Sequence, residues 1–202
     1  VTGIASYAFD GVTSDLVSVR IPESVVYIGA KAFSRARTYS AANAFVEAAS
    51  APAGYANGWD DGFSDTFYDS SNSVTVNGVV YLRNNGSGAA AVGYVGETSI
   101  VTIARSVSIG GISLTVNKVA SYAFANKNLA KIFIPDSVIT MRDRIAYANS
   151  GNVIMSLQHN MVAANWPLGW NDFGNQPVVL SSSIMTDQQG LVLLLENGEL
   201  SI

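Results

Sequence analysis

The pentapeptide Ala-Ser-Tyr-Ala-Phe occurs twice in this chain, at residues 5–9 and again at residues 120–124. Three further matches follow in the same order, at offsets of 112 to 115 residues. Four matches in one order indicate a duplication, so the sequence predicts two long units of similar fold. The further matches pair Leu16–Val25 with Leu129–Val138, Ala51–Tyr55 with Trp166–Trp170, and Gly78–Val80 with Gly190–Val192.

A shorter period runs inside each unit. Ile4 and Phe9 recur 24 residues later as Ile28 and Phe33. A period in the twenties, with apolar residues spaced L-x-x-V-x-I, is typical of a leucine-rich repeat, in which strand side chains alternate between core and surface. A single turn of this length cannot bury its apolar face, so neighbouring turns must stack around one shared core. The sequence therefore predicts a solenoid.

Leu16 through Phe33 reads L-V-S-V-R-I-P-E-S-V-V-Y-I-G-A-K-A-F and resembles the BspA-type leucine-rich repeat, which is found in bacterial surface proteins. The second copy, Leu129–Tyr147, departs from the pattern where Met141-Arg142 replaces Ile-Gly and Tyr147 replaces Phe. The resemblance implies a β-rich α/β repeat fold: a right-handed solenoid with a curved parallel sheet and short helical turns on its convex side. It also implies adhesion or host interaction at the cell surface.

We expect the segments Leu16–Ile21 and Leu129–Ile134 to be strands of the concave sheet, with Leu16, Val19 and Ile21 facing inward. Pro22 and Pro135 should end them, because proline cannot donate a hydrogen bond to the ladder. The Ala-Phe segments are expected to be short helical turns whose phenylalanines fill the core. Those phenylalanines are Phe9, Phe33 and Phe124.

Antiparallel hairpins should interrupt the solenoid between the two units. Val79–Leu82 and Ala89–Tyr94 flank Asn84-Asn85-Gly86, and Asn-Gly supplies the positive φ of a tight turn. Val107–Val116 alternates apolar and polar residues around Gly110-Gly111.

The domain organisation follows from the duplication. We expect a first repeat unit over residues 1–77 that starts mid-unit, a hairpin-rich connection over 78–118, a second unit over 119–189, and the truncated start of a further unit over 190–202. The array should continue beyond both ends. Within the first unit, residues 34–49 are rich in alanine, which favours helix, whereas the duplication favours a strand at residues 44–47.

Charge argues against nucleic acid as a partner. The chain carries 11 basic and 15 acidic residues, and no Lys or Arg lies between Arg37 and Arg83 or after Arg144. Phosphate binding needs clustered cations. The longest aliphatic run, Leu191–Leu195, is far shorter than the roughly 20 residues of a membrane span, so no span is expected.

The inventory for catalysis is poor, and we expect no enzyme and no cofactor. The single histidine, His159, has no G-x-S-x-G motif to pair with. Gly86–Ala91 fits G-x-G-x-x-A, but a strand pattern follows it rather than a helix, which favours a hairpin turn over a dinucleotide site.

An acidic loop offers two further kinds of chemistry. Paired carboxylates could act as in a glycosidase, and flexible acidic loops can also bind calcium. The loop lacks the D-x-D-x-D-G order and a downstream Glu, and loop aspartates usually form turns, so no metal is expected. The glycosidase candidates are Asp60, Asp61, Asp65 and Asp69, and the calcium candidates are Asp60, Asp61 and Asp65.

Aromatic residues gather in matching stretches of the two units. They either pack over turns too short to close the core or, if exposed, bind sugar or protein. The duplication favours packing, because a structural plug must recur in each unit. The residues are Tyr55, Trp59, Phe63, Phe67 and Tyr68 in the first unit and Trp166, Trp170 and Phe173 in the second.

The sequence thus favours a non-catalytic module that mediates protein–protein or host-surface interaction in an extracellular or cell-surface protein. Its partner would be a host or matrix protein, or a glycan. The alternatives are a carbohydrate-binding or carbohydrate-processing module and a structural stalk. Candidate contacts are Tyr55, Trp59, Asp60, Asp61, Trp170 and Asp172 in loops, and the outward strand residues Val17, Ser18, Arg20, Ala130, Lys131 and Phe133.

Overall fold

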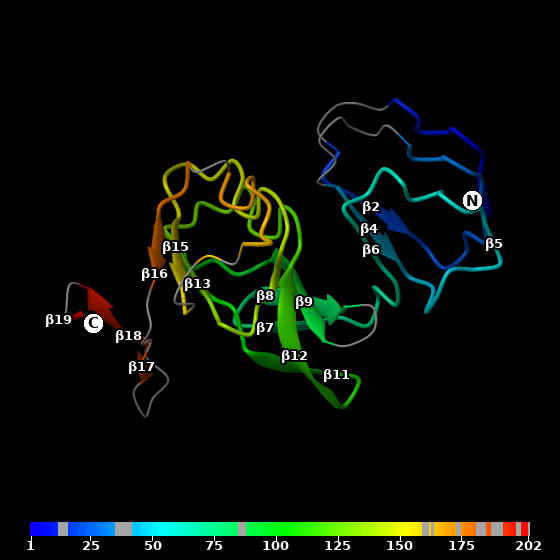
Figure 1. The fold of residues 1–202 in the computed structure, drawn as a ribbon. Coiled ribbons are helices and arrows are strands. Elements are labelled where there is room, and N and C mark those ends of the chain that lie inside the picture. The colour runs from blue at the N-terminus through cyan, green and yellow to red at the C-terminus, as the bar shows by residue number, and fades with distance from the viewer. Residues whose placement is uncertain are drawn as a thin grey trace.

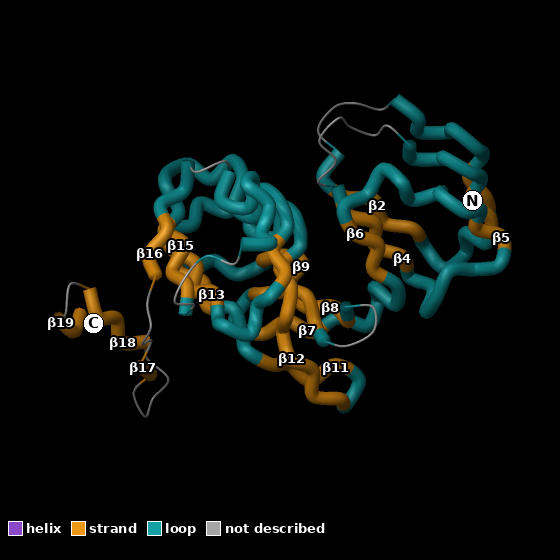
Figure 2. The backbone as a smooth tube through the Cα atoms, in the orientation of Figure 1, coloured by secondary structure: helices purple, strands orange, loops and turns teal. Residues whose placement is uncertain are grey.

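The computed structural model describes residues 1–11, 16–34, 42–84, 88–158, 162, 164–172, 175–180, 185–186, 192–196 and 199–201 (Figure 1). These residues form short strands joined by turns, and none of them is helical (Figure 2). No helix in the described part of the chain is long and apolar enough to cross a membrane.

In the first unit, each turn of the chain contributes one strand to each of two parallel sheets. In the sheet formed by β2, β4 and β6, successive strands start 22 to 25 residues apart, which matches the period of the apolar pattern. One sheet contains β1 (Gly3–Ile4), β3 (Tyr27–Ile28) and β5 (Gly54–Tyr55), and the other β2 (Ser18–Ile21), β4 (Asn43–Val46) and β6 (Asp65–Phe67).

The second unit repeats this plan, with β10 and the end of β12 supplied by the hairpin-rich segment that precedes it. Its parallel sheet has the order β10-β13-β15-β16, and β13 occupies the positions that the duplication assigns to β2. The end of β12 pairs in parallel with β14, as β1 does with β3. The strands are β10 (Ile100–Thr102), β12 (Ile112–Val119), β13 (Lys131–Ile134), β14 (Thr140–Met141), β15 (Ile154–Leu157) and β16 (Val178–Leu180).

The predicted hairpins lie between the units (Figure 1). Strands β8 and β9 are antiparallel, and so are β11 and β12 around Gly110 and Gly111, whose φ angles of 60° and 78° suit glycine. Of the first turn, Asn85 and Gly86 lie outside the described residues. The remaining strands are β7 (Val74–Val76), β8 (Val79–Arg83), β9 (Ala89–Tyr94), β11 (Ser106–Ile109), β17 (Met185–Thr186), β18 (Val192–Glu196) and β19 (Glu199–Ser201).

The strands predicted at Leu16–Ile21 and Leu129–Ile134 form close to the expected positions, as β2 and β13, and Pro22 and Pro135 directly follow them. In the alanine-rich segment, the strand that the duplication predicted at residues 44–47 is confirmed as β4. It pairs with β2 on one side and β6 on the other, and this pairing outweighs the helix propensity of alanine.

The expected helical turns do not form. In the repeated pentapeptide the amide of Ala8 donates to the carbonyl of Ala5 (3.3 Å), but the intervening Tyr7 has a φ of 59°, which a helix cannot propagate. The next amide leaves its own turn: Phe9 N–H donates to the carbonyl of Ala32 (2.8 Å). Backbone hydrogen bonds therefore join neighbouring turns instead of building helices.

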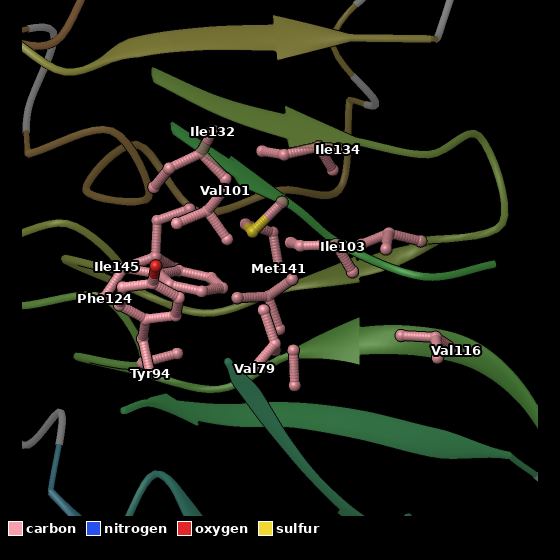
Figure 3. Close-up of a cluster of buried hydrophobic side chains, with 14 of the residues drawn as sticks. Val79, Tyr94, Val101, Ile103, Val116, Phe124, Ile132, Ile134, Met141 and Ile145 are labelled. Carbon is pink, nitrogen blue, oxygen red and sulfur yellow. The ribbon is translucent and has the colours of Figure 1, made fainter. Parts of the chain in front are cut away.

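The core of the second unit and the hairpins is continuous. Side chains from β8, β9, β10, β12, β13 and β14 point toward one another, with Phe124 and Ile145 among them (Figure 3). The phenyl ring of Phe124 is fully buried, and Phe33 is 2% exposed in the core of the first unit.

Phe9 was expected to be buried and is 43% exposed. Its ring stacks on Phe33 with centroids 5.0 Å apart, but no described turn covers its other face. Its duplicate, Phe124, has the ring centroid of the hairpin residue Tyr94 6.4 Å from its own and belongs to the same buried cluster as Ile145.

This contrast predicts unequal costs for the same substitution. Phe124→Ala should lower the free energy of unfolding by about 3 to 5 kcal/mol, because it leaves a cavity in a closed core. Phe9→Ala, its matched control, should cost about 1 kcal/mol, a usual value for a partly exposed position. Urea unfolding followed by circular dichroism measures both, and equal costs would contradict this account of the first turn.

Candidate functional site

The outward face of the β2-β4-β6 sheet carries two rows of side chains that run across the strands. In the register of β2, β4 and β6, Ser18, Asn43 and Asp65 form one row. Arg20, Phe45 and Phe67 form the other. Both rows change from exposed on β2 to buried toward β6, so only one end of this face is open to a partner.

The β6 end is closed by the second unit. The side-chain amide of Asn43 donates to the carbonyl of Ser121 (2.9 Å), across 78 residues of sequence. Phe67 is 1% exposed and packs in one cluster with Leu82 and Ala120. The two units therefore share an interface along this edge of the sheet.

A charged cluster lies at the centre of that interface. Both terminal oxygens of Asp65 accept hydrogen bonds from Arg142, through Nε (2.9 Å) and Nη2 (2.8 Å). The ammonium group of Lys118 also contacts Asp65 Oδ1 and lies 5.7 Å from the ring centre of Phe67. The side chains of Asp65 and Lys118 are 8% and 9% exposed. The hydrogen bonds to Asp65 raise the pKa of Arg142.

Sequence reasoning missed this cluster, although the duplication contains its signal. Lys118 stands where the first unit has Gly3, and Arg142 stands where it has Gly29. The second of these is the departure of Met141-Arg142 from the repeat pattern. Lys118 and Arg142 are cations where the first unit has glycine. This difference indicates that the second unit makes a contact at these positions that the first unit does not make at its equivalent positions.

The open end of the outward face borders a groove of about 350 Å³. Residues of strands β2 and β4 line it together with residues of the hairpin strands β8 and β9. Its chemistry is an apolar centre with hydroxyl groups and one cation at the rim. The lining residues are Ser18, Arg20, Phe45, Ser70, Ser73, Val80, Leu82, Val92 and Gly93.

Two candidate contact residues, Ser18 and Arg20, line this groove, and Arg20 is the charged one. Its side chain is 67% exposed, and its Nε donates to Glu47 Oε1 (2.8 Å). The same contact lowers the pKa of Glu47, with a further hydrogen bond from the amide of Glu23. Glu47 therefore fixes the direction of the guanidinium and leaves its terminal nitrogens available to a ligand.

Lys131 and Phe133 were expected to be displayed on the surface, but they are 9% and 5% exposed. They belong to β13, which has β10 on one side and β15 on the other, so neighbouring strands flank their side chains. The Lys131 ammonium also lies 5.1 Å from the ring centre of Phe133. Ala130 remains exposed, as do Val17 and Ser18 in the first unit.

The aromatic candidates for partner contact, Tyr55, Trp59 and Trp170, pack against their own units. Trp59 is 4% exposed and contacts Tyr55 and Phe33 at centroid distances of 5.2 and 6.1 Å. Trp170 is 5% exposed and contacts Trp166 at 5.1 Å. Tyr55 is half-buried, and its hydroxyl donates to the carbonyl of Val25 (3.0 Å); burial raises its pKa. Phe173 lies outside the described residues.

The aspartates of the acidic loop lie in separate environments and do not form one site. Asp60 accepts a hydrogen bond from Thr66 (2.8 Å) beside a second pocket of about 330 Å³, whereas Asp61 is exposed. Asp65 already faces two cations. Asp172 lies in a turn with a φ of 58°. Among the described residues, no three His, Cys, Asp or Glu side chains are grouped to hold a metal, and His159 lies outside that part of the chain.

Parallel strands that start 22 to 25 residues apart in the β2-β4-β6 sheet, with turn-to-turn hydrogen bonds and a shared core, define a leucine-rich repeat solenoid. The family model described as "BspA type Leucine rich repeat region" matches six copies, over residues 1–44 and 104–162, which together make up half of the chain. The chain belongs to this family.

Two solved structures are similar at low sequence identity. One is a leucine-rich repeat protein from Bacteroides capillosus: 19% identity, TM-score 0.41, covering 55% of this chain and 99% of that one. The other is a leucine-rich cell-surface protein from Faecalibacterium prausnitzii: 16% identity, TM-score 0.29, covering 91% of this chain and 52% of that one. No curated protein matches the sequence.

The buried charges predict a large effect of removing one partner. Asp65→Ala should lower the free energy of unfolding by about 3 to 5 kcal/mol, because it leaves Lys118 buried without its counter-charge. Asp136→Ala, the control, removes an exposed partner of Arg105 and should cost about 0 to 1 kcal/mol. Equal costs in urea unfolding would show that the cluster does not hold the units together.

Proposed function

We propose that this chain is a non-catalytic interaction module of a bacterial surface or secreted protein, which binds a macromolecular partner in the groove between β2, β4 and the hairpin. The groove carries the proposal because it is the place where the exposed end of an outward sheet face meets a hollow. The surface location rests on membership of the BspA-type repeat family.

The chemistry of the groove suits a protein partner. Phe45, Val80 and Leu82 give it an apolar centre, and the exposed Arg20 stands at the rim. Protein interfaces combine such an apolar centre with a polar rim, and arginine is one of the residues that contribute most to their binding energy. A host or matrix protein with acidic and apolar side chains is therefore the proposed ligand.

The lining also supports a non-catalytic role. Arg20 is the one ionisable side chain among the residues that line the groove, and a guanidinium keeps its proton at neutral pH. General acid–base catalysis needs a group that exchanges protons near the working pH. Binding, rather than chemistry, is what this set of side chains can provide.

The burial of Trp59 and Trp170 makes their variants unsuitable for testing the glycan alternative. Replacing either indole would disturb a core, so lost binding could follow from lost structure. Arg20 is exposed and can be changed without opening the fold. A binding test should therefore vary the groove rather than the aromatic loops.

The experiment screens the full chain on arrays of host-surface and matrix proteins and of glycans. Arg20→Ala should weaken a protein ligand about tenfold or more, the usual loss for a hydrogen bond to a charged group. Arg105→Ala removes an exposed arginine on the second unit and should leave binding unchanged.

Other outcomes choose between the alternatives. Glycan ligands alone, weakened by Arg20→Ala, would replace the protein partner with a carbohydrate. Failure to bind on either array would favour the stalk. Equal losses in Arg20→Ala and Arg105→Ala would remove the groove from the proposal.

A further inference from the structure

The second pocket, of about 330 Å³, lies where the acidic loop of the first unit meets the hairpin-rich segment. Residues 60 and 63–68 form one part of its wall, and Asn84 and Lys118 contribute the rest. Its volume lies within the range of pockets that bind small molecules, about 300 to 1,000 Å³. The proposed function leaves this pocket unused, because no described residue lines both it and the groove at Arg20.

Two side chains bring hydrogen-bond acceptors to the pocket wall. Asp60 Oδ2 accepts a hydrogen bond from Thr66 Oγ1 (2.8 Å), which fixes the direction of the carboxylate. Asp60 makes no other side-chain hydrogen bond in the described part of the chain, so Oδ1 is available to a ligand. The side-chain nitrogen of Asn84 donates to Asn117 Oδ1 (3.1 Å), which leaves the amide oxygen of Asn84 as a second acceptor.

Donors stand in the same wall. The hydroxyl oxygen of Tyr68 accepts a hydrogen bond from the indole of Trp59, so its own proton remains available to a ligand. Burial, followed by the charge of Asp60, raises the pKa of Tyr68, which keeps this hydroxyl protonated at neutral pH. The Lys118 side chain is 9% exposed, and its ammonium group has three donors, of which Asp65 uses one.

The charges at the pocket cancel. Asp60, Asp65 and Lys118 line it, and Arg142 donates to both terminal oxygens of Asp65, so two carboxylates accompany two cations. An anionic ligand would meet Asp60, and a cationic ligand would meet Lys118; like charges at short distance repel. The pocket therefore favours a ligand without net charge that both donates and accepts hydrogen bonds.

An aromatic wall adds an apolar surface. The ring of Phe63 is held by Phe33 and Trp59, at centroid distances of 5.0 and 6.2 Å. Aromatic rings provide a large and rigid contact area. Such a wall beside hydrogen-bonding groups suits a ring with C–H groups on its faces and hydroxyl groups at its rim.

We propose that this pocket binds one sugar residue, whose hydroxyl groups hydrogen-bond to Asp60, Asn84 and Tyr68 and whose ring packs on Phe63. A hydroxyl group both donates and accepts, which matches a wall that holds both kinds of group. The site is distinct from the groove of the proposed function, and it needs no partner protein.

Nuclear magnetic resonance of the ¹⁵N-labelled full chain tests the pocket directly. The probes are glucose, galactose, mannose and N-acetylglucosamine, each as the free sugar and as its methyl glycoside. At least one probe should shift the backbone amide signal of Tyr68 and the side-chain amide signals of Asn84 saturably, and leave the amide signal of Arg20 in place. No saturable shift with any probe, or saturable shifts at Arg20 instead, would overturn the proposal.

The two forms of each probe distinguish the sources of the sugar. Binding of a methyl glycoside would support a site for the end residue of a glycan chain, because its anomeric oxygen is substituted as in such a chain. Binding of the free sugar alone would support a site for the free molecule. Tighter binding of glycine, a zwitterion without net charge, than of every sugar would replace the sugar with an amino acid and overturn the proposal.

Neighbouring aspartates supply a matched pair of variants. Asp60→Asn keeps the shape of the side chain and an acceptor for Thr66 but removes the charge. It should weaken sugar binding about tenfold or more, the usual loss for a hydrogen bond to a charged group. Asp61→Asn changes an exposed carboxylate that does not line the pocket and should bind as wild type does. Equal binding by Asp60→Asn and wild type, or equal losses in the two variants, would overturn the proposal.

Two further results separate this inference from the proposed function. If Asp60→Asn does not fold, the signal shifts of the wild-type chain decide, because they locate the sugar without a variant. Arg20→Ala changes the groove alone and should leave sugar binding unchanged. Sugar binding that is lost in Arg20→Ala but kept in Asp60→Asn would place the sugar in the groove and overturn the proposal. A protein ligand on the array, without a sugar shift at Tyr68 or Asn84, would keep the groove function and reject this site.

Discussion

Each turn of this chain is stabilised by hydrogen bonds to the next turn and by a core shared with it, and the rest of the structure depends on this stacking. The amide that would continue a helix after Ala-Ser-Tyr-Ala instead donates to the following turn, from Phe9 to Ala32 and from Phe124 to Ile145. The side chains of Phe33 and Phe124 each enter a core that several turns share. Backbone and side chains thus stabilise the same stacking direction, which is why short strands suffice.

The repeat pattern predicted the parallel strands and the hairpins because each depends on local residues: inward apolar positions in one case, and glycines that accept positive φ in the other. Burial of individual side chains could not be predicted in this way. The same pentapeptide leaves Phe9 43% exposed and Phe124 fully buried, because Phe124 packs in the cluster to which the hairpins contribute. Likewise, Lys131 lies on an outward position yet is buried between flanking strands.

The groove illustrates a second limit of sequence reasoning. Arg20 could be named in advance because its strand was clear, but Val80 and Leu82 come from a hairpin about 60 residues further along the chain. The two surfaces are brought together where the units meet through Asp65, Lys118 and Arg142. The groove therefore depends on the contact between the units, because neither surface forms it alone.

The charged cluster also bears on how such a chain can evolve. Its acid belongs to the first unit and its cations to the second, whereas the positions that correspond to them in the other copy hold Pro177, Gly3 and Gly29. Exchange of the units by recombination would therefore place a buried charge against an apolar or empty position. Junctions between repeats are therefore not interchangeable, and the buried side chains at each junction are compatible with one order of the units.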